Sequence, residues 1–392
     1  MSRPPETAAP AGTASAAHGP VPPVLSVDGL HVTVGGPERV EAVREVSLTI
    51  GPGEAVGLVG ESGSGKSLTC RSVLGVLPPG CAVADGSIVL DGDEPAELTA
   101  LTPKEWESVR GRRLGAVFQD PASYLNPSLT VGRQLSEQLR VGRGLSRTAA
   151  HSRAVDLLAA VGLHGPGEIY HRYPHELSGG MLQRVLIAIA IACEPELLIA
   201  DEATTALDVV VQAEILELLQ RLRSEQGLAL LLVTHDLAVV ARSCDRILVM
   251  YAGEIVEEGP TADVLAAPAH PYTEALLRVA STAEAGTGEL ETIPGGAPET
   301  GAELPGCRFA ERCPYADAEC VAGPVATRLV EPGRRARCVR PAGRPAGRRQ
   351  DAGAAASAEN ASAENVPGAD ATAGTGATTA GTPEPEPEGS RV

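Results

Sequence analysis

Short apolar runs alternate with stretches of helical spacing over most of the chain. The apolar runs are continuous or alternate at every second residue, which is typical of β-strands that are buried on one or both faces. Helical spacing is clearest from Ala154 to Val161, where apolar residues recur at three and four positions and Gly162 follows the last turn. We predict strands at Val24 to Leu30, Val40 to Ile50, Glu54 to Val59, Leu197 to Ala200, Leu228 to Val233 and Ile247 to Tyr251, and a further helix at Val211 to Glu225.

The order of these elements predicts an α/β protein with a mostly parallel sheet. We place this domain at residues 24–267, with a helical subdomain at about 121–180, and a separate, smaller segment at 268–340. Residues 1–23 and 341–392 are rich in Ala, Pro, Gly and Thr and have too few apolar residues to offset the entropy of ordering. Both ends are therefore predicted to be disordered tails.

Composition excludes some classes of binding partner and some cellular locations. The formal net charge of -18 disfavours adhesion to nucleic acid or to anionic lipid, because both require a basic face. The longest apolar runs, such as Val185 to Cys193, fall short of the roughly 18 to 20 residues that span a bilayer. The first 23 residues lack the basic and apolar regions of a secretory signal. We therefore expect no nucleic-acid partner, a cytoplasmic location, and cysteines that are reduced or bound to metal.

A glycine-rich loop follows the predicted strand that ends at Val59. Residues 60–67 read Gly-Glu-Ser-Gly-Ser-Gly-Lys-Ser and match the phosphate-loop pattern at every fixed position, between a strand and a helix that starts near Lys66. The glycines let successive backbone amides point at phosphate oxygens, Lys66 reaches the β and γ phosphates, and Ser67 offers a hydroxyl to Mg²⁺. This loop predicts a site for a nucleoside triphosphate.

Polar residues follow two other predicted strands. Asp201 and Glu202 end the strand that begins at Leu197, and His235 comes shortly after Val233. Open α/β sheets bind ligands at the carboxyl ends of their parallel strands, so these side chains are expected beside the phosphate loop. Asp201 is then predicted to hold Mg²⁺ through water, Glu202 to polarise the attacking water, and His235 to contact the γ-phosphate.

Several strings resemble the nucleotide-binding subunits of ABC transporters over about residues 24–267. Gln119, in Val-Phe-Gln-Asp-Pro, resembles that family's Q-loop, and the Leu-Ser-Gly-Gly-Met string that starts at Leu177 resembles its signature. Ala206 to Asp208 resemble its D-loop, and His235 resembles its switch histidine. The resemblance implies the ABC-type phosphate-loop fold and ATP hydrolysis with Mg²⁺.

In that family two ATPase domains close head to tail, so each ATP lies between the phosphate loop of one chain and the signature of the other. The resemblance therefore implies a second ATPase chain, identical or paralogous. It assigns Gln119, Glu202 and His235 to catalysis and Ser67, Gln119 and Asp201 to Mg²⁺. The residues that it implies for ATP are Gly60, Glu61, Ser62, Gly63, Ser64, Gly65, Lys66, Ser67, Leu68, Ser178, Gly179, Gly180 and Asp208. One departure is Val34, which stands where the family usually has an aromatic residue that stacks on adenine.

Two further strings resemble the oligopeptide, dipeptide and nickel importer ATPases. One is His-Pro-Tyr-Thr-Glu-Ala-Leu-Leu from His270, and the other is Tyr-Leu-Asn-Pro from Tyr124. The resemblance implies a subunit at the cytoplasmic face of the membrane that works with two permeases and an extracytoplasmic binding protein. Dipeptides or oligopeptides are the expected cargo, with nickel or another small solute as the alternative. A soluble ABC ATPase of DNA repair or translation is disfavoured, because no long coiled coil, second ATPase domain or basic face is visible.

Four cysteines lie close together in the C-terminal segment. Cys307, Cys313, Cys320 and Cys338 have the spacing C-x5-C-x6-C-x17-C in a stretch with few apolar residues, which suggests a metal that holds the segment together. The spacing lacks the C-x2-C hairpins that are common in zinc sites. Because the extension resembles cluster-bearing members of the family, a [4Fe-4S] cluster is the preferred prediction, and zinc or no metal remain the alternatives.

Overall fold

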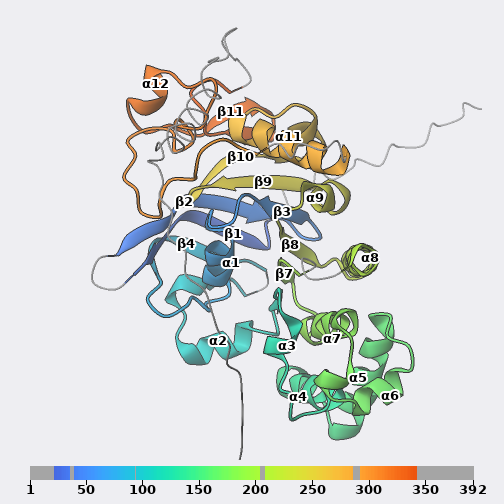
Figure 1. The fold of residues 1–392 in the computed structure, drawn as a ribbon. Helices are drawn as coiled ribbons and strands as arrows, with labels where there is room; N and C mark the ends of the chain where they lie inside the picture. The colour runs from blue at the N-terminus through green and yellow to red at the C-terminus, as the bar shows by residue number, and fades with distance from the viewer. Residues whose placement is uncertain (1–21, 36–38, 93, 204–207, 286–291, 342–392) are drawn as a thin grey trace, which may run out of the picture. The chain divides into compact units, whose positions relative to one another are not determined.

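The computed structural model of the protein describes residues 22–35, 39–92, 94–203, 208–285 and 292–341 (Figure 1). Nearly all of both predicted tails, and Ala206 and Leu207 of the string that resembles a D-loop, lie outside these ranges. Within these ranges no helix is long and apolar enough to span a membrane. The described residues form two sheets with helices around them.

The larger sheet has eight strands in the described part of the chain, in the order β11-β12-β10-β9-β3-β8-β7-β6. The five strands from β9 to β6 run parallel, whereas β10, β12 and β11 pair antiparallel along the other edge. The predicted mostly parallel α/β sheet is confirmed. The strands are β3 (Ala55–Val59), β6 (Leu114–Val117), β7 (Leu197–Asp201), β8 (Ala229–Val233), β9 (Arg246–Tyr251), β10 (Glu254–Pro260), β11 (Arg328–Glu331) and β12 (Arg334–Ala336).

The smaller sheet is antiparallel and packs on one face of the larger sheet. Its order is β2-β1-β4-β5, with β1 (Leu25–Val34), β2 (Val40–Ile50), β4 (Ala82–Leu90) and β5 (Ala96–Glu97). Successive residues of β3 explain the continuous apolar run: Val56 and Leu58 join the core on the side of the small sheet, and Ala55 and Val59 join the core on the helical side. A strand that is buried on both faces needs apolar residues at every position.

Helices surround the two sheets. Figure 1 shows α4 to α7 grouped as a lobe next to β6 and β7, in the region where the sequence predicts a helical subdomain. The α-helices are α1 (Lys66–Val73), α2 (Pro103–Val109), α3 (Pro121–Tyr124), α4 (Val131–Arg143), α5 (Arg147–Ala160), α6 (Pro166–His171), α7 (Gly179–Ile191), α8 (Val209–Gln226), α9 (Leu237–Ser243), α10 (Thr261–Ala266), α11 (Pro271–Ala285) and α12 (Ala318–Val321). Short 3-10 turns occur at Leu98–Ala100 and Pro174–Glu176.

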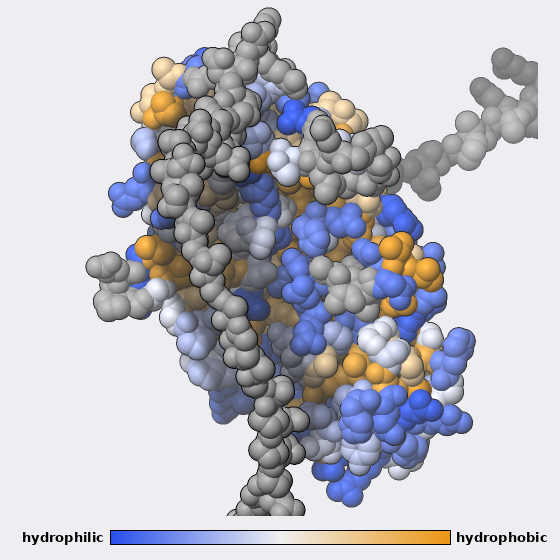
Figure 2. Space-filling view, viewed as in Figure 1, coloured by the Kyte–Doolittle hydropathy of each residue, from blue (hydrophilic) through white to orange (hydrophobic). Residues whose placement is uncertain are grey.

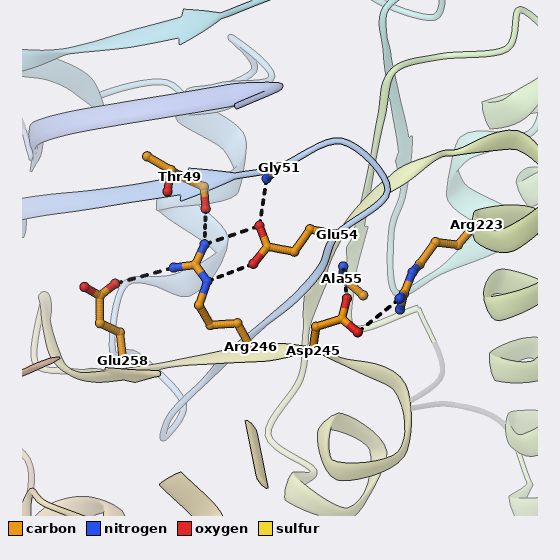
Figure 3. A network of polar contacts seen from close by, with 8 residues as sticks. All are labelled: Thr49, Gly51, Glu54, Ala55, Arg223, Asp245, Arg246 and Glu258. Atoms are coloured by element: carbon orange, nitrogen blue, oxygen red, sulfur yellow. Dashed lines mark hydrogen bonds and ion pairs between the residues drawn. The ribbon is translucent and has the colours of Figure 1, made fainter. Parts of the chain in front are cut away.

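A charged network at the start of β9 ties the two sheets together (Figure 3). The Arg246 guanidinium donates to Glu54 at 2.8 Å and to the backbone carbonyl of Thr49 in β2, and it lies 3.7 Å from Glu258 of β10. The preceding Asp245 accepts a hydrogen bond from the first amide of β3 at 2.9 Å. The side chains of Arg246 and Glu54 are each about four-fifths buried, so this pair is less screened by water than a surface ion pair.

The C-terminal segment, which the sequence presents as separate, continues the larger sheet. Its strand β12 pairs with β10, where Glu257 faces Ala336, and β11 follows at the edge. Arg334 of β12 forms an ion pair with Glu257 at 3.0 Å, and both side chains are almost fully buried. The segment is thus joined to the ATPase sheet by strand pairing. The sequence does not predict this pairing, because β10 and β12 lie far apart along the chain and no local pattern connects them.

Candidate functional site

The site lies at the carboxyl ends of four neighbouring parallel strands. The glycine-rich loop follows β3 and His235 follows β8. Asp201 is the last residue of β7, Glu202 comes directly after it, and Gln119 follows β6. Because these strands run in the same direction, their carboxyl ends meet at one edge of the sheet, where α/β proteins bind ligands. Gln119 and His235 are exposed there.

The backbone of the glycine-rich loop requires its glycines. A Cβ at Gly60 would lie 2.1 Å from the backbone oxygen of Met250, and one at Gly65, where φ is +106°, would lie 2.7 Å from the Met250 side chain. The helix α1 starts directly after Gly65. The Lys66 ammonium is buried and donates to the backbone oxygens of Gly60 at 2.8 Å and Glu61 at 2.9 Å, so the lysine lies along the inside of the loop. Burial lowers the pKa of this ammonium.

A hydroxyl and a carboxylate meet beside the loop. The Ser67 hydroxyl donates to Asp201 at 3.2 Å, although 134 positions separate them along the chain. Burial raises the pKa of the Asp201 carboxyl, and the hydrogen bond from Ser67 opposes this shift. Mg²⁺ is usually held by one or two protein oxygens together with substrate phosphates and water, so this pair fits a Mg²⁺ that arrives with a nucleotide.

Glu202 has a strained backbone. Its φ is +52°, in the region that non-glycine residues seldom adopt, and its amide donates to the Val233 carbonyl of β8 at 2.9 Å. His235 Nδ1 lies 3.9 Å from a carboxylate oxygen of Glu202. The Glu202 side chain is 25% exposed and that of His235 is 58% exposed, so both remain open to a ligand. Strain of this kind is common at functional sites, where the surrounding fold holds the residue in place.

A pocket of about 340 Å³ opens over the loop. Residues from the glycine-rich loop and Glu202 line it, together with Val34 and Thr300. Val34 therefore lines the pocket that the sequence assigns to a nucleotide. Thr300 was not expected, because it belongs to the C-terminal segment and nothing in the local sequence marks it. The full lining is Val34, Ala42, Ser62, Gly63, Gly65, Lys66, Ser67, Leu68, Glu202 and Thr300.

The string that resembles the ABC signature lies apart from this pocket. Ser178 is the N-cap of α7 and accepts a hydrogen bond from the Met181 amide at 3.4 Å, so Gly179 and Gly180 form the first turn of that helix. A Cβ at Gly180 would lie 2.7 Å from the Val211 side chain of α8. None of Ser178, Gly179 and Gly180 is among the residues that line the pocket. Asp208 caps α8, as its carboxylate accepts from the amides of residues 210 and 211.

The structure does not support the predicted metal cluster. Burial raises the pKa of Cys307 to about 12, and Cys338, Cys313 and Cys320 reinforce this shift. The backbone amide of Cys307 donates to the Cys320 oxygen at 2.7 Å. In the described part of the chain, however, no group of three or more His, Cys, Asp or Glu side chains is placed to hold a metal ion. The prediction assumed that the segment needs a metal in order to fold. In the structure the segment is joined to the rest of the chain by β12 and by buried aromatic and arginine side chains.

The fold and the site together define a phosphate-loop nucleotide-binding protein. Comparisons with known proteins place it more closely. Residues 43–205 match the family model described as ABC transporter, and residues 256–320 match the model described as the oligopeptide/dipeptide transporter C-terminal region. The chain is 46% identical over 295 residues to the dipeptide transport ATP-binding protein DppD of Bacillus subtilis (strain 168). The matched stretch covers 74% of this chain and 87% of that protein.

Two solved structures have the same fold. One is a dimeric post-hydrolysis state of the ATP-binding cassette MJ0796 with ADP and Pi, at a TM-score of 0.54 and 29% identity, covering 60% of this chain and 98% of that one. The other is CbiO1 of Clostridium perfringens, part of the cbiONQ transporter complex, at a TM-score of 0.54 and 28% identity, covering 62% of this chain and 91% of that one. The chain belongs to the family of ABC transporter ATP-binding proteins, and it is an ATPase.

Proposed function

We propose that this protein is the ATP-hydrolysing subunit of a bacterial ABC importer and couples ATP binding and hydrolysis to the uptake of dipeptides or oligopeptides. The observation that carries the proposal is the combination of the phosphate-loop site with a C-terminal segment of the oligopeptide/dipeptide transporter type. DppD, its relative in Bacillus subtilis, is a dipeptide transport protein.

Different residues around the pocket bind the phosphates and the Mg²⁺ in ATP hydrolysis. Lys66 and the loop amides bind the phosphates, and Ser67 and Asp201 hold Mg²⁺, with Gln119 reaching the metal from the neighbouring strand β6. Support comes from the Ser67–Asp201 hydrogen bond and from the position of the loop at the start of α1. Bound Mg²⁺ neutralises the charge that develops on the phosphate oxygens.

Glu202 takes the part of the general base. Its carboxylate lines the pocket and accepts a proton from the water that attacks the γ-phosphate, while His235 contacts the transferred phosphate. Support comes from the fixed backbone of Glu202 and from its neighbour His235 at 3.9 Å. A general base of this kind contributes about 10²- to 10⁴-fold to the rate.

A second ATPase chain, identical or paralogous, completes the site. Ser178, Gly179 and Gly180 stand at a helix N-terminus, which favours bound anions, yet the pocket of the same chain does not reach them. They are therefore available for the γ-phosphate of a partner. An apolar surface is also available for association: Val209 and Val210, next to Asp208, are 81% and 69% exposed, and Figure 2 shows apolar surface at the position of α8.

The permeases dock at a different surface. An apolar groove of about 610 Å³ runs between α1 and the helical lobe, next to Gln119. Phe118 and Tyr124 stack at 4.6 Å along it, and Tyr124 is 51% exposed. We assign this groove to a helix from one of two membrane-embedded permeases, which places the protein at the cytoplasmic face of the membrane. The extracytoplasmic binding protein then belongs to the same complex.

The test is growth and uptake by a strain that lacks the gene. Complementation with the wild-type chain is expected to restore growth on dipeptides or oligopeptides as the source of an essential amino acid, and Lys66→Ala is expected to fail although the protein is still produced. Uptake of ⁶³Ni in the same strains is the comparison. Loss of nickel uptake with normal growth on peptides would overturn the peptide assignment.

A further inference from the structure

One arginine of the C-terminal segment, Arg312, binds a side chain of the phosphate loop. Arg312 donates to both carboxylate oxygens of Glu61, at 2.9 and 3.0 Å. Its other hydrogen bonds go to the Tyr251 hydroxyl at 3.2 Å and to the backbone oxygens of Ile293 at 3.2 Å and Pro294 at 3.0 Å. The planar guanidinium has five N–H donors, and every one has a partner here.

The segment also holds Glu61 from a second direction. The Glu61 amide donates to the Tyr272 hydroxyl at 2.8 Å, at the start of α11. The Tyr272 ring is fully buried and lies 4.5 Å from the ring of Tyr251 and 5.4 Å from that of Phe309, between centroids. Packed aromatic rings of this kind leave little room for movement. Both the amide and the carboxylate of Glu61 are therefore fixed by residues outside the ATPase core.

The same arginine holds a strap that reaches the pocket. Residues 293–302 form this strap: Arg312 binds the carbonyls at its start, and Arg308 donates to the Ala302 oxygen at 3.0 Å near its end. Between these points Thr300 lines the nucleotide pocket. Gly301, at φ +86°, lies so close to the small sheet that a Cβ would come within 2.4 Å of the Val40 side chain.

We propose that the C-terminal segment is part of the nucleotide site and that Arg312 is the positioning residue that couples it to the phosphate loop. Arg312 is 6% exposed and Glu61 is 28% exposed, so this bidentate pair is shielded from water and salt more than a surface pair. Glu61 occupies a variable position of the phosphate-loop pattern, so the pattern itself does not demand an acid there. The proposal rests on the assignment of the pocket to ATP.

The experiment measures ATP and ADP affinity of the full-length chain by fluorescence of a labelled nucleotide. Arg312→Gln is expected to weaken ATP binding about tenfold, the range expected for loss of charge-assisted hydrogen bonds. Arg312→Lys should recover only part of this loss, because an ammonium cannot bind a carboxylate in the bidentate manner of a guanidinium. The control is Arg335→Gln in β12 of the same segment, whose side chain is 62% exposed, and this variant should bind ATP as wild type does.

Two further variants separate positioning from loss of folding. Glu61→Gln breaks the pair from the other end without changing the buried arginine, and combining it with Arg312→Gln should add little to either single effect. Thr300→Ala should weaken ATP binding about two- to threefold through the strap alone, by loss of one hydrogen-bonding group. Thermal unfolding without nucleotide shows which variants are folded. ATP affinity within twofold of wild type in folded Arg312→Gln and Glu61→Gln would overturn the inference and leave the proposed function intact, whereas a wild-type chain that binds no ATP would overturn both.

Discussion

At the scale of single residues, the site combines buried charges with strained backbone. Lys66 is buried inside its loop, Asp201 is buried beside Ser67, and Glu202 has a φ of +52°. Each of these arrangements costs free energy when it is considered alone, because burial disfavours a charged side chain and a positive φ disfavours a residue other than glycine. The surrounding fold maintains them together because they lie at one sheet edge where strands β3, β7 and β8 end.

Glu202→Gln is expected to bind ATP with nearly wild-type affinity and to hydrolyse it at least about 100-fold more slowly, since an amide cannot accept the proton of the attacking water. Phosphate release and nucleotide binding, measured on the same preparation, check this. The matched control is Glu217→Gln on the exposed side of α8, which should keep full turnover. Full hydrolysis by the Glu202→Gln protein would remove Glu202 from the base role.

His270 is expected to make stability depend on pH. It is fully buried, its Nδ1 accepts from the Tyr272 amide, and burial lowers its pKa to about 3. The unfolded chain, with a pKa of about 6.5, binds this proton first. The contribution of the neutral His270 to the free energy of unfolding is therefore complete above about pH 6.5. It is lost as pH falls towards 3, by roughly 1.4 kcal/mol per pH unit.

Urea unfolding between pH 7.5 and 5 measures this effect. The comparison is His270→Asn, whose side-chain oxygen can still accept the amide but does not titrate in this range. The difference in unfolding free energy between the two proteins should shrink as pH falls. A difference that stays constant across the range would show that His270 does not remain neutral in the fold.

At the scale of elements, the strand β12 joins the C-terminal segment to the ATPase sheet. The pairing with β10 is short, and the buried Arg334–Glu257 ion pair supports it. Glu257 also accepts from the amides of Ala269 at 2.8 Å and His270 at 2.9 Å, just before α11. One carboxylate thus organises both the strand and the helix that carries Tyr272 to the phosphate loop.

Glu257→Ala is expected to destabilise the protein by about 3 to 5 kcal/mol, because it removes the buried carboxylate that faces the buried Arg334 charge. Glu331→Ala is a matched control, since Glu331 lies 3.6 Å from the same arginine but is 62% exposed, and its removal should cost under about 1 kcal/mol. Chemical denaturation followed by circular dichroism gives both values. Equal effects of the two substitutions would contradict the role of burial.

At the scale of the whole molecule, one chain carries two separate parts of the proposed ATP site: the pocket over the phosphate loop and the signature string at the start of α7. The pocket contains Lys66 and Glu202, whereas Ser178 caps α7 outside it. If two chains pair head to tail, as proposed above, each pocket lies against the signature of the other chain, and defects in the two halves should complement each other in a mixture.

The test mixes Lys66→Ala with Ser178→Arg, each inactive alone. If identical chains pair, half of the dimers are mixed and each mixed dimer keeps one intact site, so roughly a quarter of the wild-type ATPase activity should return. A mixture of Lys66→Ala with Glu202→Gln should stay inactive, because both residues belong to the same half. Head-to-tail pairing of identical chains would be contradicted if ATPase activity returned equally in both mixtures, or if it returned in neither.

The sequence by itself determined the parts that depend on short-range structure. The phosphate loop is recognisable because a tight turn before a helix demands glycines at fixed spacing, and the strands β3, β7 and β8 are recognisable because burial on both faces demands continuous apolar runs. It also placed Asp201, Glu202 and His235 at one sheet edge, since parallel strands end together. Six of the described strands were not predicted. β5, β6, β11 and β12 have too few residues to show a clear period, and in β4 and β10 glycine and acidic residues interrupt the apolar pattern.

Only the tertiary structure decided how distant segments meet. Arg312 and Glu61 are 251 positions apart, and no spacing or composition connects them. The same holds for Thr300 in the pocket and for β12 beside β10. The cysteine spacing suggested a metal, but spacing along a chain does not fix the geometry of side chains, and the described residues provide no metal-binding group. Contacts of this kind arise from the packing of the whole fold, which local sequence patterns do not encode.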